Sequence, residues 1–320
     1  MVEISLMIEG QNGLNWSRWQ RLVEEAEKLG FAGVFRSDHF TNQQKPDLDS
    51  LEMIVSLAYL ADHTRSIHFG PLVAPLSFRD PVMLARQATA IDDLSNGRMI
   101  LGLGAGWQER EHTLFGYHLG DVGERMSRFA EGLEVITRLR KSDEPVSFAG
   151  QFFQLHEALL LPRPRRSGGP RIMIGGNGPK RTLPLAARYA DIWNAVFISP
   201  TDFYERSQQL DRLLTAAGRQ PADVKRTAMT AVIFARADAG IERRLTWQRS
   251  RPELADLPLP QLIEQMVSKG LALCGNAEQI LSQIQLYTQA GAQELMLQWP
   301  DLDDIEGLRA FASDVLPHLA

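Results

Sequence analysis

Short apolar segments alternate with longer amphipathic segments along almost the whole chain. The apolar segments have the length of buried strands, and the segments between them place apolar residues at helical spacing, as in 16–29 and 122–141. The predicted strands are 3–8, 33–35, 67–75, 98–106, 171–176, 191–197, 228–235 and 293–299. Repeated strand–helix units of this number predict a (β/α)8 TIM barrel, formed as one domain over residues 1–320.

Two stretches depart from this repeat. Residues 145–169 combine a hairpin-like alternation with the loop sequence RPRRSGG, and residues 236–270 lack clean strand spacing. We interpret both as insertions in connections that follow strands. Insertions at those positions are expected to cover an active site.

Composition and charge narrow the class of protein. Of 320 residues, 44% are hydrophobic and 23% charged, and the net charge of −5 gives no basic footprint for nucleic acid. The single cysteine, Cys274, excludes an intrachain disulfide and suits a reducing compartment. The chain contains no apolar run of about 18 residues and no signal-like N-terminus, so we expect a cytoplasmic protein without a membrane partner.

Polar residues directly follow the second predicted strand. Strand ends in a parallel barrel face the active site, so Arg36, Ser37, Asp38 and His39 should lie at its mouth. Asp38 and His39 are a candidate acid/base pair, while Arg36 and Ser37 receive no role. The alternative is that His39 is an ordinary imidazole at the edge of the core. No other histidine has metal-ligand spacing with His39, so no metal site is predicted.

The fourth predicted strand ends in the sequence GLGAGW. The segment resembles a dinucleotide fingerprint but lacks the third glycine and the helix start of that motif. We expect Gly104, Ala105 and Gly106 to let a flat ring lie against the top of the barrel, with Trp107 as a wall. The alternative is that these small residues relieve crowding inside the barrel.

The fifth predicted strand runs into GGNGPKRT. Gly175, Gly176, Asn177 and Gly178 permit a close turn, and Pro179 is expected to begin a helix. Free backbone N–H groups and the dipole of such a helix form an anion site, which predicts a phosphate cradle. The alternative is a tight turn that uses glycine for its geometry alone.

Five segments together carry a resemblance to a known family. They are SDHF, GPLVAPLSFRDP, NGRMILGLGAGWQEREHTLFG, IMIGGNGPKRTLPLAARYADIWN and LCGNAEQILSQIQLYTQAGAQELML. In order and spacing they resemble the bacterial luciferase-like superfamily. The resemblance implies a (β/α)8 barrel, a homodimer, and either FMN or the deazaflavin coenzyme F420 across the barrel mouth. The Asp-His pair and the form of GAGW are more similar to the F420-using branch.

The resemblance also implies roles for particular residues. Asp38 would contact the deazaflavin, and His39 would donate or accept a proton. A cis peptide bond between Leu72 and Val73 would lie behind the ring, and the turn 176–178 would bind phosphate. Trp107 stands where F420-dependent glucose-6-phosphate dehydrogenases have a catalytic glutamate, which argues against sugar phosphates; Glu109 and Glu111 are candidate replacements.

These observations leave three functional hypotheses. The first is F420-dependent hydride transfer to or from a small organic substrate, with proton exchange at His39. The second is an FMN-dependent monooxygenase. The third is a non-catalytic barrel that binds a flavin. The sequence identifies no particular substrate.

Overall fold

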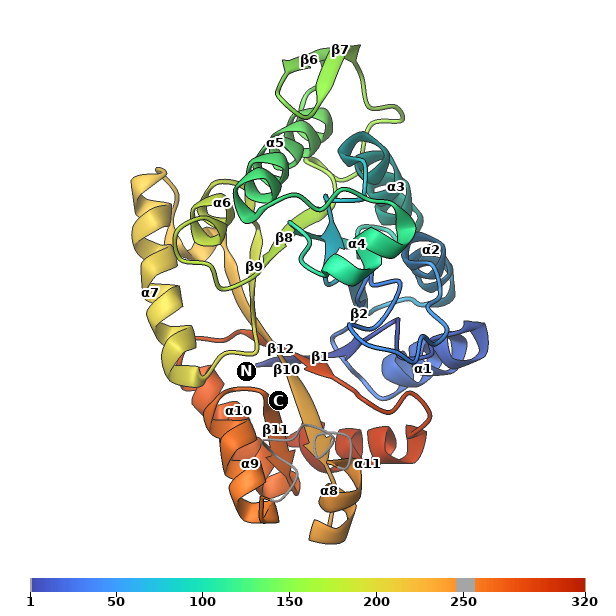
Figure 1. The fold of residues 1–320 in the computed structure, drawn as a ribbon, viewed down its shortest axis with the longest axis vertical. Helices are drawn as coiled ribbons and strands as arrows, with labels where there is room; N and C mark the ends of the chain where they lie inside the picture. The colour runs from blue at the N-terminus through green and yellow to red at the C-terminus, as the bar shows by residue number, and fades with distance from the viewer. Residues whose placement is uncertain (1, 246–256, 320) are drawn as a thin grey trace.

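The computed structural model describes residues 2–245 and 257–319, and it forms a parallel barrel surrounded by helices (Figure 1). The strands are β1 (Glu3–Ile8), β2 (Gly33–Arg36), β3 (His68–Pro71), β4 (Ala74–Pro75), β5 (Ile100–Gly104), β8 (Arg171–Gly175), β9 (Ile192–Val196), β10 (Lys225–Phe234), β11 (Ala272–Gly275) and β12 (Glu294–Gln298). The helices are α1 (Trp16–Lys28), α2 (Met53–His63), α3 (Pro81–Leu94), α4 (Glu109–Phe115), α5 (Val122–Lys141), α6 (Thr182–Tyr189), α7 (Pro200–Ala216), α8 (Asp238–Arg244), α9 (Leu259–Ser268), α10 (Ala277–Gln289) and α11 (Ile305–Val315).

The order of the strands confirms the predicted barrel. The hydrogen-bonded path runs β3-β2-β1-β12-β10-β9-β8-β5-β4. Its two ends, β3 and β4, belong to one stretch of chain, and a bridge between Phe69 and Met99 joins β3 to the segment before β5. Strand β11, which has four residues and pairs with the second half of β10, was not predicted from the sequence.

The barrel is filled by its own side chains. Its interior cluster is rich in methionine and consists of Met7, Phe35, Leu72, Ile100, Met173, Ile192, Met229 and Met296. A larger cluster lies between the strands and the surrounding helices. Because both faces of these strands are covered, their sequences are almost continuously apolar, which made them easy to predict.

The third predicted strand is interrupted at its centre. Residues 67–75 form the two short strands β3 and β4, with Leu72 and Val73 between them. The peptide bond between Leu72 and Val73 is cis, as the resemblance implied.

The two predicted insertions have different positions. Residues 145–169 do contain a hairpin, made of β6 (Val146–Ala149) and β7 (Gln154–Ala158), and it extends beyond α5 in Figure 1. This hairpin follows a helix and precedes β8, so its expected position after a strand was wrong, and it does not belong to the strand-end face. Helices α8 and α9 lie within 236–270 and follow β10; residues 246–256 lie outside the described part.

No helix in 2–245 or 257–319 combines the length and apolar character needed to cross a bilayer. Within the same ranges, no group of three or more histidine, cysteine or acidic side chains is arranged to hold a metal ion.

Candidate active site

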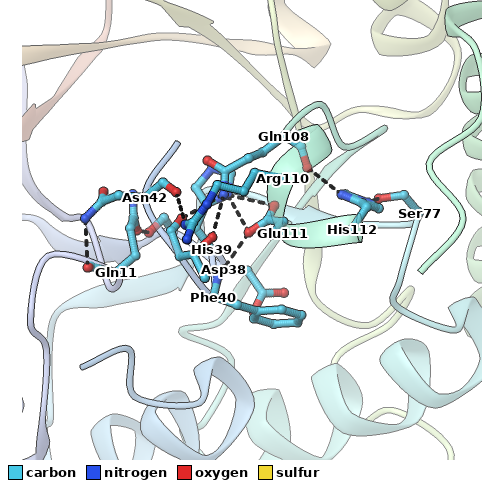
Figure 2. A network of polar contacts seen from close by, with 12 residues as sticks. Gln11, Asp38, His39, Phe40, Asn42, Ser77, Gln108, Arg110, Glu111 and His112 are labelled. Atoms are coloured by element: carbon cyan, nitrogen blue, oxygen red, sulfur yellow. Dashed lines mark hydrogen bonds and ion pairs between the residues drawn. The ribbon is translucent and has the colours of Figure 1, made fainter. Parts of the chain in front are cut away.

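His39 and Glu111 form a hydrogen-bonded pair at the tip of β2 (Figure 2). Nδ1 of His39 lies 3.0 Å from Oε1 and 3.2 Å from Oε2 of Glu111, whose carboxylate is buried. Oε2 also accepts the backbone N–H of Phe40 at 3.0 Å. Because an ionised carboxylate can only accept hydrogen bonds, Nδ1 carries the proton and the lone pair is on Nε2.

Glu111 also sets the proton affinity of His39. Burial lowers the pKa of the imidazole, but the hydrogen bond and negative charge of Glu111 outweigh burial and raise the pKa above its ordinary value. The side chain of His39 is 19% exposed, and no residue in the described ranges hydrogen-bonds to Nε2. Nε2 is therefore placed to exchange a proton with a bound molecule.

Asp38 lies beside His39 in sequence but makes a different contact. Arg79 donates from Nε to Oδ2 at 2.8 Å and from Nη2 to Oδ1 at 2.6 Å, and the carboxylate is almost fully buried. Burial raises the pKa of Asp38, and the charge and hydrogen bonds of Arg79 act in the opposite direction. The predicted Asp38–His39 acid/base pair is thus not formed: Asp38 anchors the tip of β2 to the residues that precede α3.

Arg36 and Ser37 are structural links in the wall of the barrel. The fully buried Arg36 donates from Nη1 to Ser56 Oγ at 2.8 Å, and burial lowers its pKa to about 10. The Ser37 hydroxyl donates to Gln11 Oε1 at 2.8 Å. Together they join β2 to α2 and to the loop after β1, and neither side chain is available to a substrate.

Helix α4, which the sequence analysis did not predict, carries Glu111 to the site. Both ring nitrogens of His112 in this helix are within hydrogen-bonding distance of a partner. Nδ1 lies 2.7 Å from the carbonyl oxygen of Gln108, and Nε2 lies 2.8 Å from Ser77 Oγ. Gln108 Nε2 donates to the carbonyl oxygen of Thr41 at 2.7 Å. These contacts, shown in Figure 2, fix α4 against the loops that follow β2 and β4.

The two glutamates that were candidate replacements differ in position. Glu111 is buried and bound to His39, whereas Glu109 is exposed at the first turn of α4. Trp107 packs edge-on against the His39 ring with a centroid separation of 5.4 Å, and half of its surface is exposed. Trp107 therefore lies beside His39, and its role as a wall for a ring stays a prediction.

Val73 packs closely against two glycines, Gly104 at the end of β5 and Gly175 at the end of β8. A Cβ atom on Gly104 would lie 2.5 Å from Val73 Cγ2, and one on Gly175 would lie 3.0 Å from Cγ1. At Gly106, which has a φ of 83°, a Cβ would lie 2.1 Å from Ser77 Oγ. Larger residues at Gly104 or Gly175 would displace Val73, so these two glycines relieve crowding. A flat ring on this surface stays a prediction.

The turn after β8 is held by its neighbour β9. The Asn177 side chain donates to the Val196 carbonyl oxygen at 2.7 Å and accepts the Val196 N–H at 2.9 Å. The expected helix start at Pro179 was wrong, because this residue lies in a turn and α6 begins at Thr182. At Gly178 a Cβ would lie 2.8 Å from Thr182 Oγ1, so glycine is required here for geometry.

A cavity of about 960 Å³ opens at the ends of β10 and β12. Val232, Gln298, Trp299 and Asn12 are among the residues that line it. Its volume is in the range of sites for cofactors and drug-sized ligands. It lies at the end of the barrel that carries His39, because parallel strands present all their carboxyl ends on one side.

The chain was compared with families and proteins of known identity. A family model described as luciferase-like monooxygenase matches residues 3–294. An F420-dependent glucose-6-phosphate dehydrogenase of Kineococcus radiotolerans is 28% identical over 92% of this chain and 90% of its own length. An F420-dependent hydroxymycolic acid dehydrogenase of Mycobacterium tuberculosis is 30% identical over 94% of this chain and 85% of its own length.

A solved structure gives the same fold. It is an F420-dependent secondary alcohol dehydrogenase in complex with an F420-acetone adduct, with a TM-score of 0.83, 20% identity, and 98% of each chain covered. At this identity the likeness supports the barrel architecture and no more.

Proposed function

The chain belongs to the luciferase-like monooxygenase family, and from this premise we propose that it is an F420-dependent oxidoreductase that interconverts an alcohol and a carbonyl compound. The observation that carries the proposal is the His39–Glu111 pair at the barrel mouth, with Nε2 of His39 available. F420-dependent relatives that align over nine-tenths of the chain support the choice of cofactor.

When bound, F420 supplies a hydride donor and acceptor at C5 of its ring. The chain would supply the proton transfer. In the direction of alcohol oxidation, Nε2 of His39 takes the hydroxyl proton of the substrate, and the resulting imidazolium is stabilised by the Glu111 carboxylate 3.0 Å from Nδ1. In the direction of reduction, the same nitrogen returns the proton to the carbonyl oxygen. Glu111 acts as a positioning residue, because it holds the tautomer and the orientation of the ring.

The residues at the floor of the mouth fit a flat cofactor. Leu72 and Val73 would lie behind the ring, and Gly104, Ala105 and Gly106 would allow it to approach the backbone. Trp107 would close one edge of the site. On the other side, Gly178 would offer its backbone N–H to a phosphate, with Asn177 holding the turn in shape. Gly175 and Gly176 would let the phosphate approach the backbone, since the N–H of Gly176 already donates to the Asn194 carbonyl oxygen at 2.9 Å. For Asp38 we propose an indirect part, through its anchoring of the His39 backbone.

The substrate is proposed to be a neutral alcohol or ketone. Trp107 occupies the position at which glucose-6-phosphate dehydrogenases of this family have an acidic side chain. An indole offers an apolar wall and no charge, which disfavours a sugar phosphate. The relative that acts on a hydroxymycolic acid supports a secondary alcohol carried on an apolar molecule.

A second candidate is an FMN-dependent monooxygenase, which the description of the matching family favours. Reduced FMN reacts with oxygen, whereas a deazaflavin has carbon at position 5 and performs hydride chemistry. The third hypothesis, a non-catalytic flavin-binding barrel, gives no reason for a buried glutamate to orient the exposed nitrogen of a histidine.

We also propose a homodimer located in the cytoplasm. Val55 on α2 and Met83 on α3 are both exposed on adjacent helices, which suits a partner surface. The single cysteine is consistent with a reducing compartment. The net charge of −5 supports the absence of a nucleic-acid partner.

The proposed role of His39 is tested by the His39→Ala variant. With F420 and a panel of secondary alcohols, turnover should fall about 10²–10⁴-fold, the usual contribution of a general acid/base. Binding of F420 should persist, which separates the loss of proton transfer from the loss of the site. Turnover equal to that of the wild type would eliminate this role.

A further inference from the structure

Phe197, the residue that follows β9, has a backbone conformation that phenylalanine rarely adopts. Its φ is 47°, in the left-handed region that favours glycine and asparagine. A bulky residue in this region has a strained backbone, and such residues concentrate at ligand-binding sites. Its side chain is 38% exposed, so burial of the ring does not compensate for the strain.

The surrounding structure forces this conformation on Phe197. The Asn177 side chain holds both the N–H and the carbonyl oxygen of Val196, and the N–H of Phe197 donates to the Met229 carbonyl oxygen at 2.9 Å. Val196 packs with the barrel interior and Ile198 with the outer cluster. Side chains along a strand normally point alternately into and out of the barrel, so Val196 and Ile198 should point the same way. They belong to different clusters, so the alternation shifts by one residue at Phe197. The ring of Phe197 belongs to neither cluster.

The position of Phe197 relates it to His39. Counted from β2 in either direction round the barrel, with β3 and β4 taken as one strand, β9 is the fourth strand. The tips of β2 and β9 are thus on opposite sides of the mouth. Val73 and the glycines of β5 and β8 lie along one of the two walls between them.

We infer that Phe197 is a binding residue for the conjugated ring of the cofactor, on the side of the mouth opposite His39. The inference rests on the proposed function, because it requires a flat cofactor at this mouth. An exposed aromatic side chain on a fixed backbone can contact such a ring at little cost in side-chain entropy, because it has only two side-chain torsions. Contact with the bound cofactor would then offset the backbone strain at Phe197. In the protein without cofactor this strain is not offset.

The test uses Phe197→Asn, because asparagine tolerates a left-handed backbone but lacks the ring. We expect the variant to bind F420 about tenfold more weakly than the wild type, with Phe197→Tyr restoring most of the affinity. We expect its Tm without cofactor to be unchanged or higher by about 1–3 °C, since strain is relieved and little packing is lost. A structural role would give the opposite pattern, with a lower Tm.

Glu157 supplies a matched control. It also has a positive φ, of 45°, but lies in β7 of the hairpin beyond α5. Glu157→Asn should leave F420 affinity unchanged. Equal affinities of the wild type and Phe197→Asn for F420 would overturn the inference while leaving the proposed function intact. If the wild type bound neither F420 nor FMN, the proposed function would fail, and the inference with it.

Discussion

At the scale of single residues, the chemistry depends on how one histidine is held. The sequence placed His39 at the mouth of a barrel, because it follows a short apolar strand. Its partner Glu111 lies 72 residues away and was named only as one of two candidates. Burial of the carboxylate, which distinguishes Glu111 from Glu109, depends on the packing of α4 and leaves no signal in local sequence.

The same pair predicts a pH dependence. Alcohol oxidation needs neutral His39, so its rate should rise with pH through the pKa of His39, which Glu111 holds above the ordinary value. Glu111→Gln removes the charge that raises this pKa, so the rising limb should move to lower pH and turnover should fall. Profiles of kcat/KM against pH measure both effects. Glu109→Gln is the control, and a shift of equal size in that variant would contradict the assignment.

Asp38 leads to a prediction about stability. Asp38→Asn breaks the bidentate pair with Arg79 in a buried position. Removal of one partner of a buried pair typically costs about 3–5 kcal/mol, and we expect the lower end because Arg79 keeps its contact with Glu52. Denaturant unfolding measures this loss. Asp47→Asn, which breaks the exposed pair with Arg110, should have a much smaller effect, and equal losses would contradict the proposed anchoring.

At the scale of elements, long periodic segments were predictable and short ones were not. The helix expected over 122–141 has those limits in the structure. Helix α4 has seven residues and β11 four, too few for a period to emerge. The hairpin within 145–169 was predicted, but its position relative to the barrel was not. The sequence alone did not show that α5 completes the preceding βα unit, which places the hairpin before a strand and not after one.

The junction of β4, β5 and β8 gives a prediction at this scale. Gly104→Ala would place a methyl group 2.5 Å from Val73, so the strands must shift. We expect a loss of about 1–3 kcal/mol in stability and weaker binding of F420, measured by unfolding and titration. A Cβ atom on Gly123, near the start of α5, would lie 3.0 Å from Asp121 Oδ1 and 3.8 Å from Arg181 Nη1, both on exposed side chains, so Gly123→Ala should change neither. A Gly104→Ala protein with wild-type affinity would contradict a ring lying on this surface.

At the scale of the whole molecule, the barrel brings together residues from four strand ends. The architecture followed from the sequence because eight apolar strands leave few alternatives. The oligomeric state could not be predicted from the sequence, because the pattern of apolar residues does not distinguish exposed ones from buried ones. In the structure Val55 and Met83 lie on adjacent helices, and this surface supports the proposed homodimer.

Light scattering tests the dimer directly. The double variant Val55→Glu, Met83→Glu should convert a dimer of the wild type into a monomer, since buried charges without partners disrupt an interface. Leu286→Glu on α10 changes an equally exposed apolar residue and should leave the dimer intact. A wild-type monomer, or a double variant that remains dimeric, would contradict this assignment of the interface.

The most direct test of the central claim is a parallel titration of the purified protein with F420 and FMN, followed by fluorescence. We predict tight binding of F420 and much weaker binding of FMN. Tight binding of FMN, accompanied by oxygen consumption when the bound flavin is reduced, would contradict the account and assign the protein to the monooxygenases.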